Sequence, residues 1–389
     1  MEGLAITSKG IEDITALEIK ELINSESEIK DSCVIFNIKK LEDLSLLCYK
    51  AQSVEKILFL FGFFDFKDDF EQKIKETIEK IKFDDWLDKK NNFRVTCKRV
   101  DYEQLSSEEI AGNIGALIIE NIKKNKKYKQ KVELDNPDIT FLIFINRNTA
   151  YFGVDFSGKD LHKREYKLFA HPASLRSTIA YSLLRIADLK QKESLLDSFC
   201  HSGEIPIESA LYLTNFPVNY FSKEKFAFLK FKPLKKLNFN KFYENIDKKI
   251  TKPKKSKIYC VDFKLMNINA AKKNAKIAGI NKAINFSRID PEWLDLKLDK
   301  ESIDKIVTHP PELTKHTNPK DIEKIHDQFF YQAEFIIKKD GKVVVITKTT
   351  DLIKKAAEKY KFKVEKEREV WEGKEAFKLV VFSKLIDKL

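Results

Sequence analysis

Four polar segments in the C-terminal half have residue types and positions that can do chemistry. They are residues 197–204 (DSFCHSGE), Asp262, Asp290 and residues 309–312 (HPPE), and each follows a stretch with strand character. Ligands of open parallel sheets bind at the carboxyl ends of the strands. There, one acid can accept hydrogen bonds from ribose hydroxyls and another from an adenine amino group. A single acid after a strand is often a helix cap, but the order of these acids indicates a cofactor that contains a nucleoside.

The tetrapeptide His309-Pro310-Pro311-Glu312 carries the most information. Two prolines after a buried strand end its hydrogen bonding and hold the backbone rigid. Such a segment can aim a backbone carbonyl and a side chain into a cleft. A plain strand terminator is the alternative, and the position after the fourth strand favours the functional interpretation.

Alternating strands and helices must position these segments from about Ser174 onward. Strand character recurs at residues 193–199, 257–263, 283–287, 302–309, 342–347, 362–367 and 377–384, and helical stretches at 205–213, 267–278, 321–337 and 352–360. This alternation predicts an α/β, Rossmann-like fold, with a parallel sheet between two layers of helices. The last two strands have no helix between them, so they predict a terminal antiparallel hairpin.

The N-terminal half reads as two α+β units. In residues 1–60, the strand-like segments LAITS and CVIFNI flank an amphipathic helix over residues 11–23. In the second unit, Ser106 and Glu109 have capping-box spacing ahead of a helix. Residues 140–145 and 149–156 then predict a hairpin.

A run of lysines follows that second helix and surrounds Tyr128, with no acid inside it; its members are Lys123, Lys124, Lys126, Lys127, Lys129 and Lys131. A charge run is usually a solvated helix end. Here it precedes a sheet in a basic chain and interleaves an aromatic residue, which favours RNA contact. A second lysine-rich stretch, which includes Lys248, Lys249, Lys252, Lys254, Lys255 and Lys257, is interpreted as a surface loop.

The composition sets outer limits on the class of protein. The chain has 389 residues and 43% hydrophobic residues, which is enough for two or three packed domains. Its net charge of +12 favours a polyanionic partner, and a lysine-rich proteome is the alternative. The five cysteines are scattered without a C-x-x-C pair, so neither disulfides nor a metal site are expected. With neither a signal peptide nor a membrane-spanning stretch in the sequence, we expect a soluble, cytoplasmic protein.

Three segments resemble a known family, the THUMP-domain-containing class I S-adenosylmethionine-dependent RNA methyltransferases, which include tRNA and rRNA guanine-N2 methyltransferases. They are Asn136-Pro137-Asp138, residues 151–184 with the linker LHKREYKLFAHPASLR, and residues 195–211 (LLDSFCHSGEIPIESAL). The family writes the last of these much like LLDPFCGSGTIPIEAAL. The resemblance covers nearly the whole chain.

The resemblance implies a ferredoxin-like domain over residues 1–60, a tRNA-binding THUMP domain over 61–157, a linker over 158–175 and a methyltransferase domain over 176–389. It implies S-adenosylmethionine as the cofactor and structured RNA (tRNA) as the partner. The sequence does not name an oligomeric state, and a monomer is the expectation. The implied cofactor-binding residues are Ser174, Leu175, Asp197, Phe199, Ser202, Gly203, Asp262 and Asp290. The implied catalytic residues are His309, Pro310, Pro311 and Glu312, and the linker adds Lys163, Arg164 and Lys167 to the RNA-binding lysines.

Four positions depart from the family's motifs. His201 stands where the family has a glycine, so its side chain is expected to obstruct the cofactor. Glu204 replaces Thr and adds negative charge near the cofactor's carboxylate. His309 replaces an Asn or Asp that holds the target amine, and Glu312 replaces an aromatic that stacks on the target base.

Two functions remain open at this stage. The first is methyl transfer to a base amine such as guanine N2 in tRNA. The second is RNA binding by a methyltransferase-like scaffold, a pseudoenzyme whose chemistry is lost through the four departures. A nicotinamide-dependent oxidoreductase is excluded, because the first loop lacks G-x-G-x-x-G and the terminal hairpin does not belong to that fold.

Overall fold

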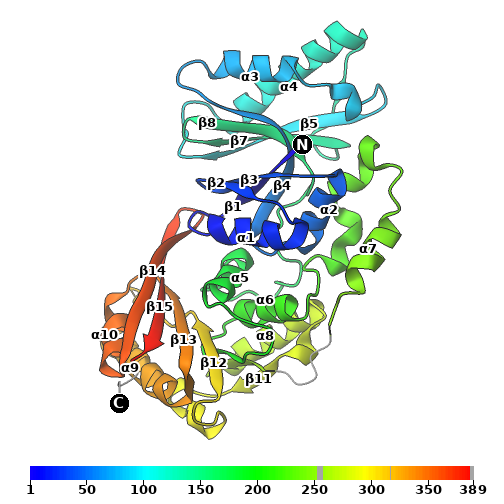
Figure 1. Ribbon diagram of the computed structural model, residues 1–389. Coiled ribbons are helices and arrows are strands. Elements are labelled where there is room, and N and C mark those ends of the chain that lie inside the picture. The colour runs from blue at the N-terminus through cyan, green and yellow to red at the C-terminus, as the bar shows by residue number, and fades with distance from the viewer. Residues whose placement is uncertain (252–256, 316, 386–389) are drawn as a thin grey trace. The chain divides into compact units, whose positions relative to one another are not determined.

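The computed structural model describes residues 1–251, 257–315 and 317–385, and the chain forms two compact units (Figure 1). Unit 1 comprises Met1–Thr7, Thr15–Leu161 and Ser222–Ile246. Unit 2 comprises Ser8–Ile14, His162–Phe221 and the chain from Asp247 onward. Among the described residues, none of the helices is long and apolar enough to cross a membrane.

Unit 1 is built on one eight-stranded sheet, in the order β2-β3-β1-β4-β8-β7-β5-β6. The strands are β1 (Glu2–Thr7), β2 (Ser27–Lys30), β3 (Cys33–Asn37), β4 (Val54–Asp65), β5 (Asn92–Val100), β6 (Lys131–Val132), β7 (Ile139–Asn146) and β8 (Thr149–Asp155). With α1 (Glu12–Ile23) and α2 (Leu41–Lys50), the first four strands follow the β-α-β-β-α-β order of a ferredoxin-like fold, and all their pairings are antiparallel.

Strand β4 joins the two halves of this sheet. Its residue Phe59 lies opposite Gly3 of β1 on one side and Val154 of β8 on the other. The boundary that the resemblance implied at residue 60 therefore runs through a single continuous strand. Because β4 is shared, both halves of the sheet belong to one unit.

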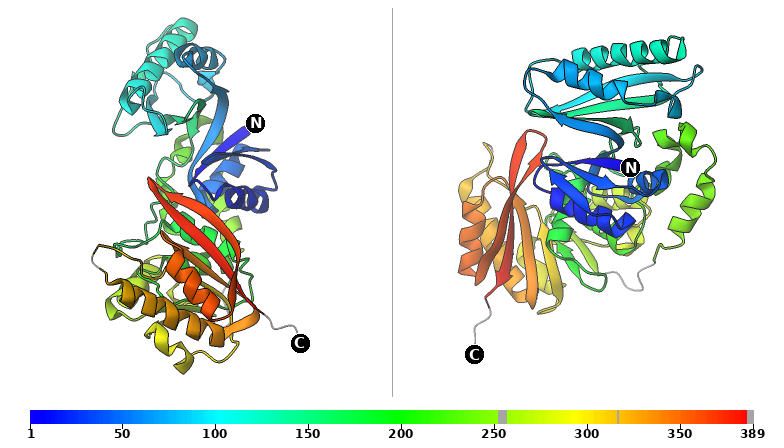
Figure 2. Two further views of the ribbon diagram at one scale, coloured as in Figure 1. Left: turned by 90° about the vertical axis from the view of Figure 1, so that its left-hand side faces the viewer. Right: turned by 45° about the horizontal axis from the view of Figure 1, so that its top comes forward.

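Helices α3 (Phe70–Glu79) and α4 (Ser107–Lys126) cover the second half of the sheet (Figure 2). The predicted capping box begins α4, since Ser106 Oγ accepts the Glu109 N–H while the Glu109 carboxylate accepts the Ser106 N–H. The helix buries Ile110, Ile114, Ile118 and Ile122 against the sheet, whereas Leu117 is only partly buried. The predicted hairpin is also confirmed, as β7 pairs antiparallel with β8.

Residues 222–246 depart from the predicted domain order, because they pack in unit 1 although they follow the first strand of unit 2. The ring of Phe231 lies 5.1 Å from that of Phe156 and 5.7 Å from that of Trp86. Burial of these aromatic rings holds the segment in unit 1. Helix α7 (Phe239–Asp247) ends it. Of the lysines after α7, Lys248, Lys249 and Lys257 are exposed as expected, while Lys252, Lys254 and Lys255 lie outside the described residues.

Unit 2 contains a seven-stranded sheet in the order β11-β10-β9-β12-β13-β15-β14. Its strands are β9 (Leu195–Asp197), β10 (Ile258–Asp262), β11 (Asn285–Arg288), β12 (Ile303–Thr308), β13 (Ile337–Thr347), β14 (Phe362–Glu372) and β15 (Glu375–Lys384). The first five strands in this order run parallel, and β15 pairs antiparallel with both β13 and β14. The predicted parallel sheet with a terminal hairpin is confirmed.

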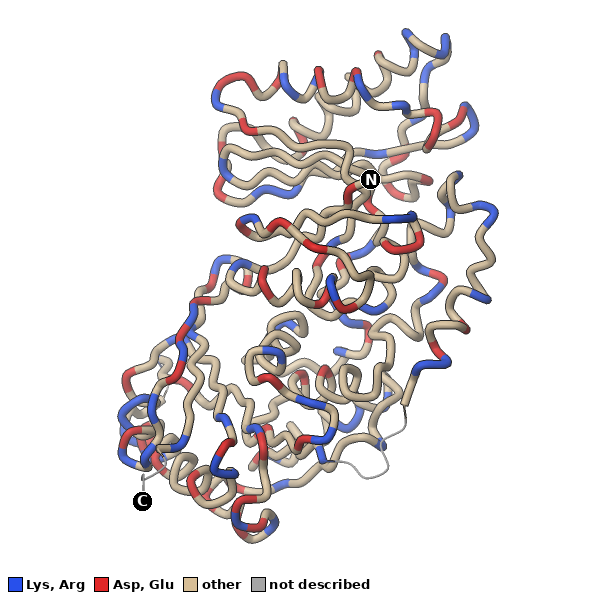
Figure 3. Tube along the Cα trace, in the orientation of Figure 1, with Lys and Arg blue, Asp and Glu red and all other residues tan. Residues whose placement is uncertain are grey.

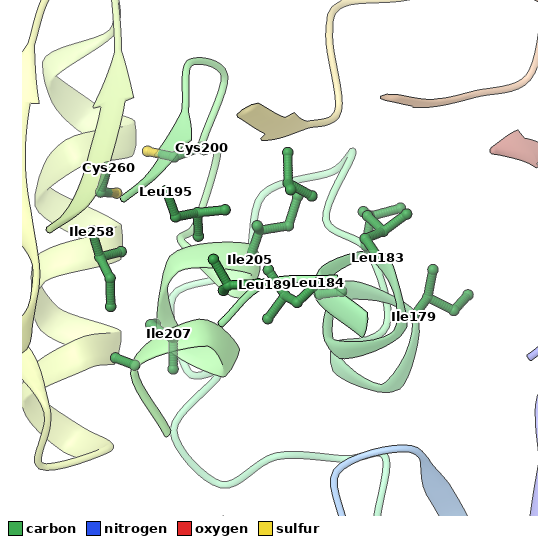
Figure 4. Close-up of a cluster of buried hydrophobic side chains, with 14 of the residues drawn as sticks. Ile179, Leu183, Leu184, Leu189, Leu195, Cys200, Ile205, Ile207, Ile258 and Cys260 are labelled. Atoms are coloured by element: carbon green, nitrogen blue, oxygen red, sulfur yellow. The ribbon is translucent and has the colours of Figure 1, made fainter. Parts of the chain in front are cut away.

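Helices cover both faces of the unit 2 sheet, with α5 (Ser177–Ile186), α6 (Glu204–Leu213) and α8 (Leu265–Ile277) on one side and α9 (Pro319–Ile336) and α10 (Asp351–Lys359) on the other (Figure 1). Successive residues of a strand pack against opposite helix layers. Leu195 joins the cluster of α5 and α6, drawn in Figure 4, and Leu196 joins the cluster of α9. Val344 and Val345 divide in the same way, which is the period-2 pattern of a sheet buried on both faces.

Candidate active site

The carboxyl ends of four neighbouring parallel strands gather the predicted site residues. Strands β9 and β10 end at Asp197 and Asp262, while Asp290 and His309 follow β11 and β12. Because the strand order is β11-β10-β9-β12, these ends form one continuous edge. The chain moves outward from β9 in both directions, so this edge is the topological switch point where open α/β sheets bind ligands.

The Asp197 carboxyl lies inside the loop that follows β9. Its Oδ1 accepts hydrogen bonds from Thr308 Oγ1 at 2.7 Å and from the Phe199 N–H at 3.3 Å. Complete burial raises the pKa of Asp197 to about 8, although these two hydrogen bonds oppose the shift. Asp197 therefore joins the loop to the end of β12, and Phe199 is buried beside it against Phe329.

Two left-handed residues shape the turn between β9 and α6. Gly203 has a φ of 90°, and a Cβ there would lie 2.8 Å from Ala271 Cβ of α8. A larger residue would push the loop away from α8, so glycine is required at this position. His201 has a φ of 47°, and its N–H donates to Asp262 Oδ2 at 3.1 Å.

Asp262 is buried and holds three hydrogen bonds. Besides the His201 N–H, its Oδ1 accepts from the Lys264 N–H at 2.9 Å and from Asn267 Nδ2 at 3.0 Å. Burial raises the pKa of Asp262, and the three donors limit the rise. A carboxylate has about four acceptor positions, so Oδ2 can accept one further hydrogen bond from a ligand hydroxyl.

The His201 ring is directed at the His309 backbone. Its Nε2 lies 3.0 Å from the His309 carbonyl oxygen, and because a carbonyl only accepts, Nε2 carries the proton. The ring stacks on His171 with centroids 4.5 Å apart. Burial, with smaller contributions from His309 and His171, lowers the pKa of His201 to about 3, so the ring is neutral near pH 7. The side chain expected to obstruct the cofactor thus contacts protein groups on two sides.

Lys167 neutralises the extra charge of Glu204. The Lys167 ammonium lies 3.2 Å from Glu204 Oε1 and donates to the Leu175 carbonyl at 2.7 Å, while Ser202 Oγ donates to Glu204 at 2.7 Å. Lys167 thus already has partners within unit 2, and its contact with RNA stays a prediction. Its charge is needed inside unit 2, because a buried carboxylate without a partner is costly.

The linker is fastened to the same loop. Ser174 Oγ lies 2.7 Å from Ser202 Oγ, so the structure brings together these two predicted residues. Asn274 of α8 donates to the carbonyls of both Phe169 and Ser202 at 3.0 Å. Leu175 is buried in the neighbouring core and offers the site only its backbone.

His309 and Glu312 face each other after β12. His309 Nε2 lies 3.5 Å from Glu312 Oε1, and both side chains are largely buried. Glu312 Oε1 also accepts the Lys348 N–H. Burial by itself raises the pKa of Glu312, but His309 and the Lys348 N–H outweigh it and lower the pKa. The loop between them is held by His326 of α9, whose Nε2 lies 3.0 Å from the Pro311 carbonyl oxygen.

Asp290 lies apart from these contacts. It is exposed, and its Oδ1 accepts the Glu292 N–H at 3.2 Å as the N-cap of a short 3-10 helix, Pro291–Leu296. The helix-cap interpretation therefore holds for Asp290, and its role toward an adenine amino group stays a prediction.

The residues predicted to bind RNA include both exposed and buried cations. The six lysines of residues 123–131 are all exposed, in the last turn of α4 and in the residues that follow it, where basic residues gather in Figure 3. Lys163 is exposed as well. Arg164 is buried and pairs with Glu208 at 3.0 Å, so the prediction that it contacts RNA is wrong. The guanidinium neutralises a fully buried carboxylate, which also accepts from Tyr166 Oη at 2.7 Å.

The edge contains polar atoms that suit a polar ligand. Ser198 Oγ, His201 Nδ1 and the His309 ring nitrogens are buried and have no hydrogen-bond partner among the described residues. Buried polar groups normally find partners. Together with the open position on Asp262 Oδ2, they fit a cofactor that carries hydroxyl, amino and carboxylate groups.

Sequence reasoning missed several residues that complete this edge, namely His171, Thr308, Asn267, Asn274 and Lys348. His171 lies in the linker motif that carried the resemblance, and this was the available signal. Thr308, Asn274 and Lys348 are revealed only by long-range contacts, whereas Asn267 binds Asp262 five residues earlier and has no distinctive motif.

Comparisons with known proteins agree with this geometry. Residues 164–376 match the family described as RMKL-like, methyltransferase domain, and residues 69–155 match the THUMP domain. The chain is 29% identical over 376 residues to the tRNA (guanine(6)-N2)-methyltransferase of Methanocaldococcus jannaschii, which covers 96% of this chain and 97% of that one. It is 27% identical to the protein of the same name from Archaeoglobus fulgidus, with 97% and 91% covered.

Solved structures share the whole fold. A possible methylase from Clostridium difficile 630 superposes with a TM-score of 0.85 at 20% identity, covering 100% of this chain and 99% of that one. TrmN from Thermus thermophilus gives 0.72 at 20% identity, with 99% of both chains covered. The predicted fold class is confirmed. Because the first family match spans more than half of the residues, the chain belongs to the RMKL-like methyltransferase family.

Proposed function

We propose that this protein transfers a methyl group from S-adenosylmethionine to the N2 amine of a guanine in tRNA. The observation that carries the proposal is a hydrogen bond from His201 Nε2 to the His309 carbonyl oxygen. It joins the loop after β9 to the segment after β12. This bond holds a nucleoside-binding loop and an amine-binding segment against each other. The names of the two full-length relatives support the choice of tRNA and of guanine N2.

The cofactor would lie along the carboxyl ends of β9, β10 and β11. Asp262 Oδ2 would accept a hydrogen bond from a ribose hydroxyl. The loop of Ser202 and Gly203 would contact the amino-acid part of the cofactor. Asp290 would accept the adenine amino group. When bound, the cofactor supplies a methyl group activated by a positively charged sulfur.

The chain's own residues would bind and orient the target base. The Pro310 carbonyl and a His309 ring nitrogen are acceptors for the two amine hydrogens. Rigid positioning of the amine for in-line attack supplies most of the acceleration in such a site. Glu312 is directed toward His309 and Lys348, so stacking on the base must come from another residue than the one at 312.

The lysines at the end of α4 would contact tRNA phosphates. Such contacts release counterions, so binding should weaken steeply with salt. We propose further that the enzyme is monomeric and cytoplasmic. Light scattering after gel filtration tests the first point, because it measures the mass of the particle in solution.

The scaffold alternative is less well supported. The two relatives that match nearly the whole chain are both named tRNA (guanine(6)-N2)-methyltransferase, which favours an active enzyme. Two of the four departures from the family's motifs, His201 and Glu204, are also matched by contacts within the fold.

The experiment is methyl transfer with purified protein, radiolabelled cofactor and transcribed tRNA, followed by nucleoside analysis. We expect N2-methylguanosine as the product, and we expect Asp262→Ala to abolish cofactor binding in calorimetry while tRNA binding persists. Absence of transfer by wild-type protein across a full set of tRNAs, together with undetectable cofactor binding, would establish the scaffold instead.

A further inference from the structure

We propose that His309 and Glu312 form an acid–base dyad, in which His309 takes the proton released by the target amine and Glu312 orients the ring and stabilises its charge. The inference rests on the proposed function. It assigns a proton acceptor to the reaction, at the position where the resemblance places an Asn or Asp.

The carboxylate of the dyad is fixed in place. The Lys348 N–H binds one oxygen of Glu312, and the Glu312 side chain is only 14% exposed. Pro310 and Pro311 hold the backbone between the two residues, and His326 binds the Pro311 carbonyl. Glu312 therefore keeps its place beside His309 without support from a ligand.

The imidazole of the dyad is also confined. Phe377 lies edge-on to the ring with centroids 6.0 Å apart, and His201 lies edge-on at 5.5 Å. His309 Nε2 is the nitrogen nearest Glu312, 3.5 Å from Oε1, and both ring nitrogens are buried without a hydrogen-bond partner among the described residues. When Nε2 carries the proton that faces the carboxylate, Nδ1 is left as the acceptor.

This arrangement meets a requirement of the chemistry. The N2 lone pair forms the new N–C bond while the S–C bond of the cofactor breaks, with its electron pair passing to sulfur. The methylated amine then carries a positive charge and must lose one proton. That proton passes to His309 Nδ1, and the imidazolium so formed keeps its Nε2–H toward the Glu312 carboxylate. A positioned general base of this kind contributes typically about 10²–10⁴-fold to the rate.

Charged and titratable groups on several elements face His309. Glu312 lies on its own loop, His201 on the loop after β9, His171 in the linker and Glu372 on β14. His201 is neutral near pH 7, so it does not repel an imidazolium at His309. An imidazolium formed at His309 would lie near the carboxylates of Glu312 and Glu372.

The test follows single-turnover methyl transfer to tRNA from pH 5.5 to 8.5 in wild-type protein and in His309→Asn, Glu312→Gln and Glu323→Gln. We expect the wild-type rate to rise with pH along a one-proton limb and then level off. Glu312→Gln should lower the plateau at least about 10-fold and move the limb to lower pH, because the imidazolium loses its counter-charge. His309→Asn should retain slow transfer without the limb. Glu323 is an exposed carboxylate on α9, so the control variant Glu323→Gln should show the wild-type rate and pH dependence.

A second measurement needs neither cofactor nor RNA. Nitrogen-15 NMR of histidine-labelled protein, assigned with His309→Asn, should show Nε2 as the protonated nitrogen of neutral His309. Its titration should move to lower pH in Glu312→Gln but not in Glu323→Gln. Calorimetry with S-adenosylmethionine should give equal affinities for wild type and Glu312→Gln, which separates loss of rate from loss of binding.

The outcomes separate this inference from the proposed function. Normal transfer to tRNA with the same pH limb in His309→Asn, or with an unshifted His309 titration in Glu312→Gln, overturns the dyad and leaves the function intact. Absence of transfer in wild type at every pH overturns the function and the base role together, even if NMR finds the two groups coupled.

Discussion

Replacing Arg164 by Met should destabilise unit 2 and leave RNA binding unchanged. The Arg164 and Glu208 side chains are 1% and 0% exposed, and their charged atoms lie 3.0 Å apart. Loss of the guanidinium leaves a carboxylate buried with Tyr166 as a neutral donor. Removing one partner of a buried pair costs about 3–5 kcal/mol. At about 2–4 °C per kcal/mol for domains of this size, the melting temperature should fall by roughly 6–20 °C.

Calorimetry of the full chain measures this change, with tRNA affinity measured in parallel at low salt. Lys163→Met is the matched control, because Lys163 is the exposed cation next to Arg164 and should change affinity rather than stability. The double variant Arg164→Met/Glu208→Leu should recover part of the loss, since it removes the unpaired charge. An unchanged melting temperature together with a tenfold weaker tRNA complex would refute the structural assignment of Arg164.

Two further predictions concern pH and salt. Unfolded histidine titrates near pH 6.5 and His201 near 3, so between these values the unfolded chain binds the extra proton and wild-type stability falls as pH falls. His201→Asn, which tolerates the left-handed backbone, should flatten the acid limb of melting temperature against pH, and an unchanged limb would contradict the assignment. The double variant Lys123→Ala/Lys124→Ala should weaken tRNA binding and reduce the slope of log affinity against log salt by about two. Titrations with tRNA at several salt concentrations measure this slope. A wild-type slope would show that these lysines do not contact phosphates.

Local patterns in the sequence were sufficient for the strands of unit 2, for helix α4 and for the edge that carries the site. The capping box of Ser106 and Glu109 and the terminal hairpin depend on residues close in the chain, and both are confirmed. The strand ends at Asp197, Asp262 and His309 were also found, because alternation and proline mark them. The four departures from the family's motifs were visible from residue type alone.

Only the tertiary structure decided what those side chains do. Arg164 and Glu208 are 44 residues apart, His201 and His309 are 108 apart, and Glu312 binds a backbone N–H 36 residues later. No periodic pattern in the sequence predicts such pairs. The residue type is the same whether a charged side chain or an imidazole contacts phosphate, solvent or a buried partner. The desolvation cost of a buried charge then selects the nearest opposite charge in the fold. For this reason Arg164 and Lys167 are structural cations, and Glu312 is directed toward His309.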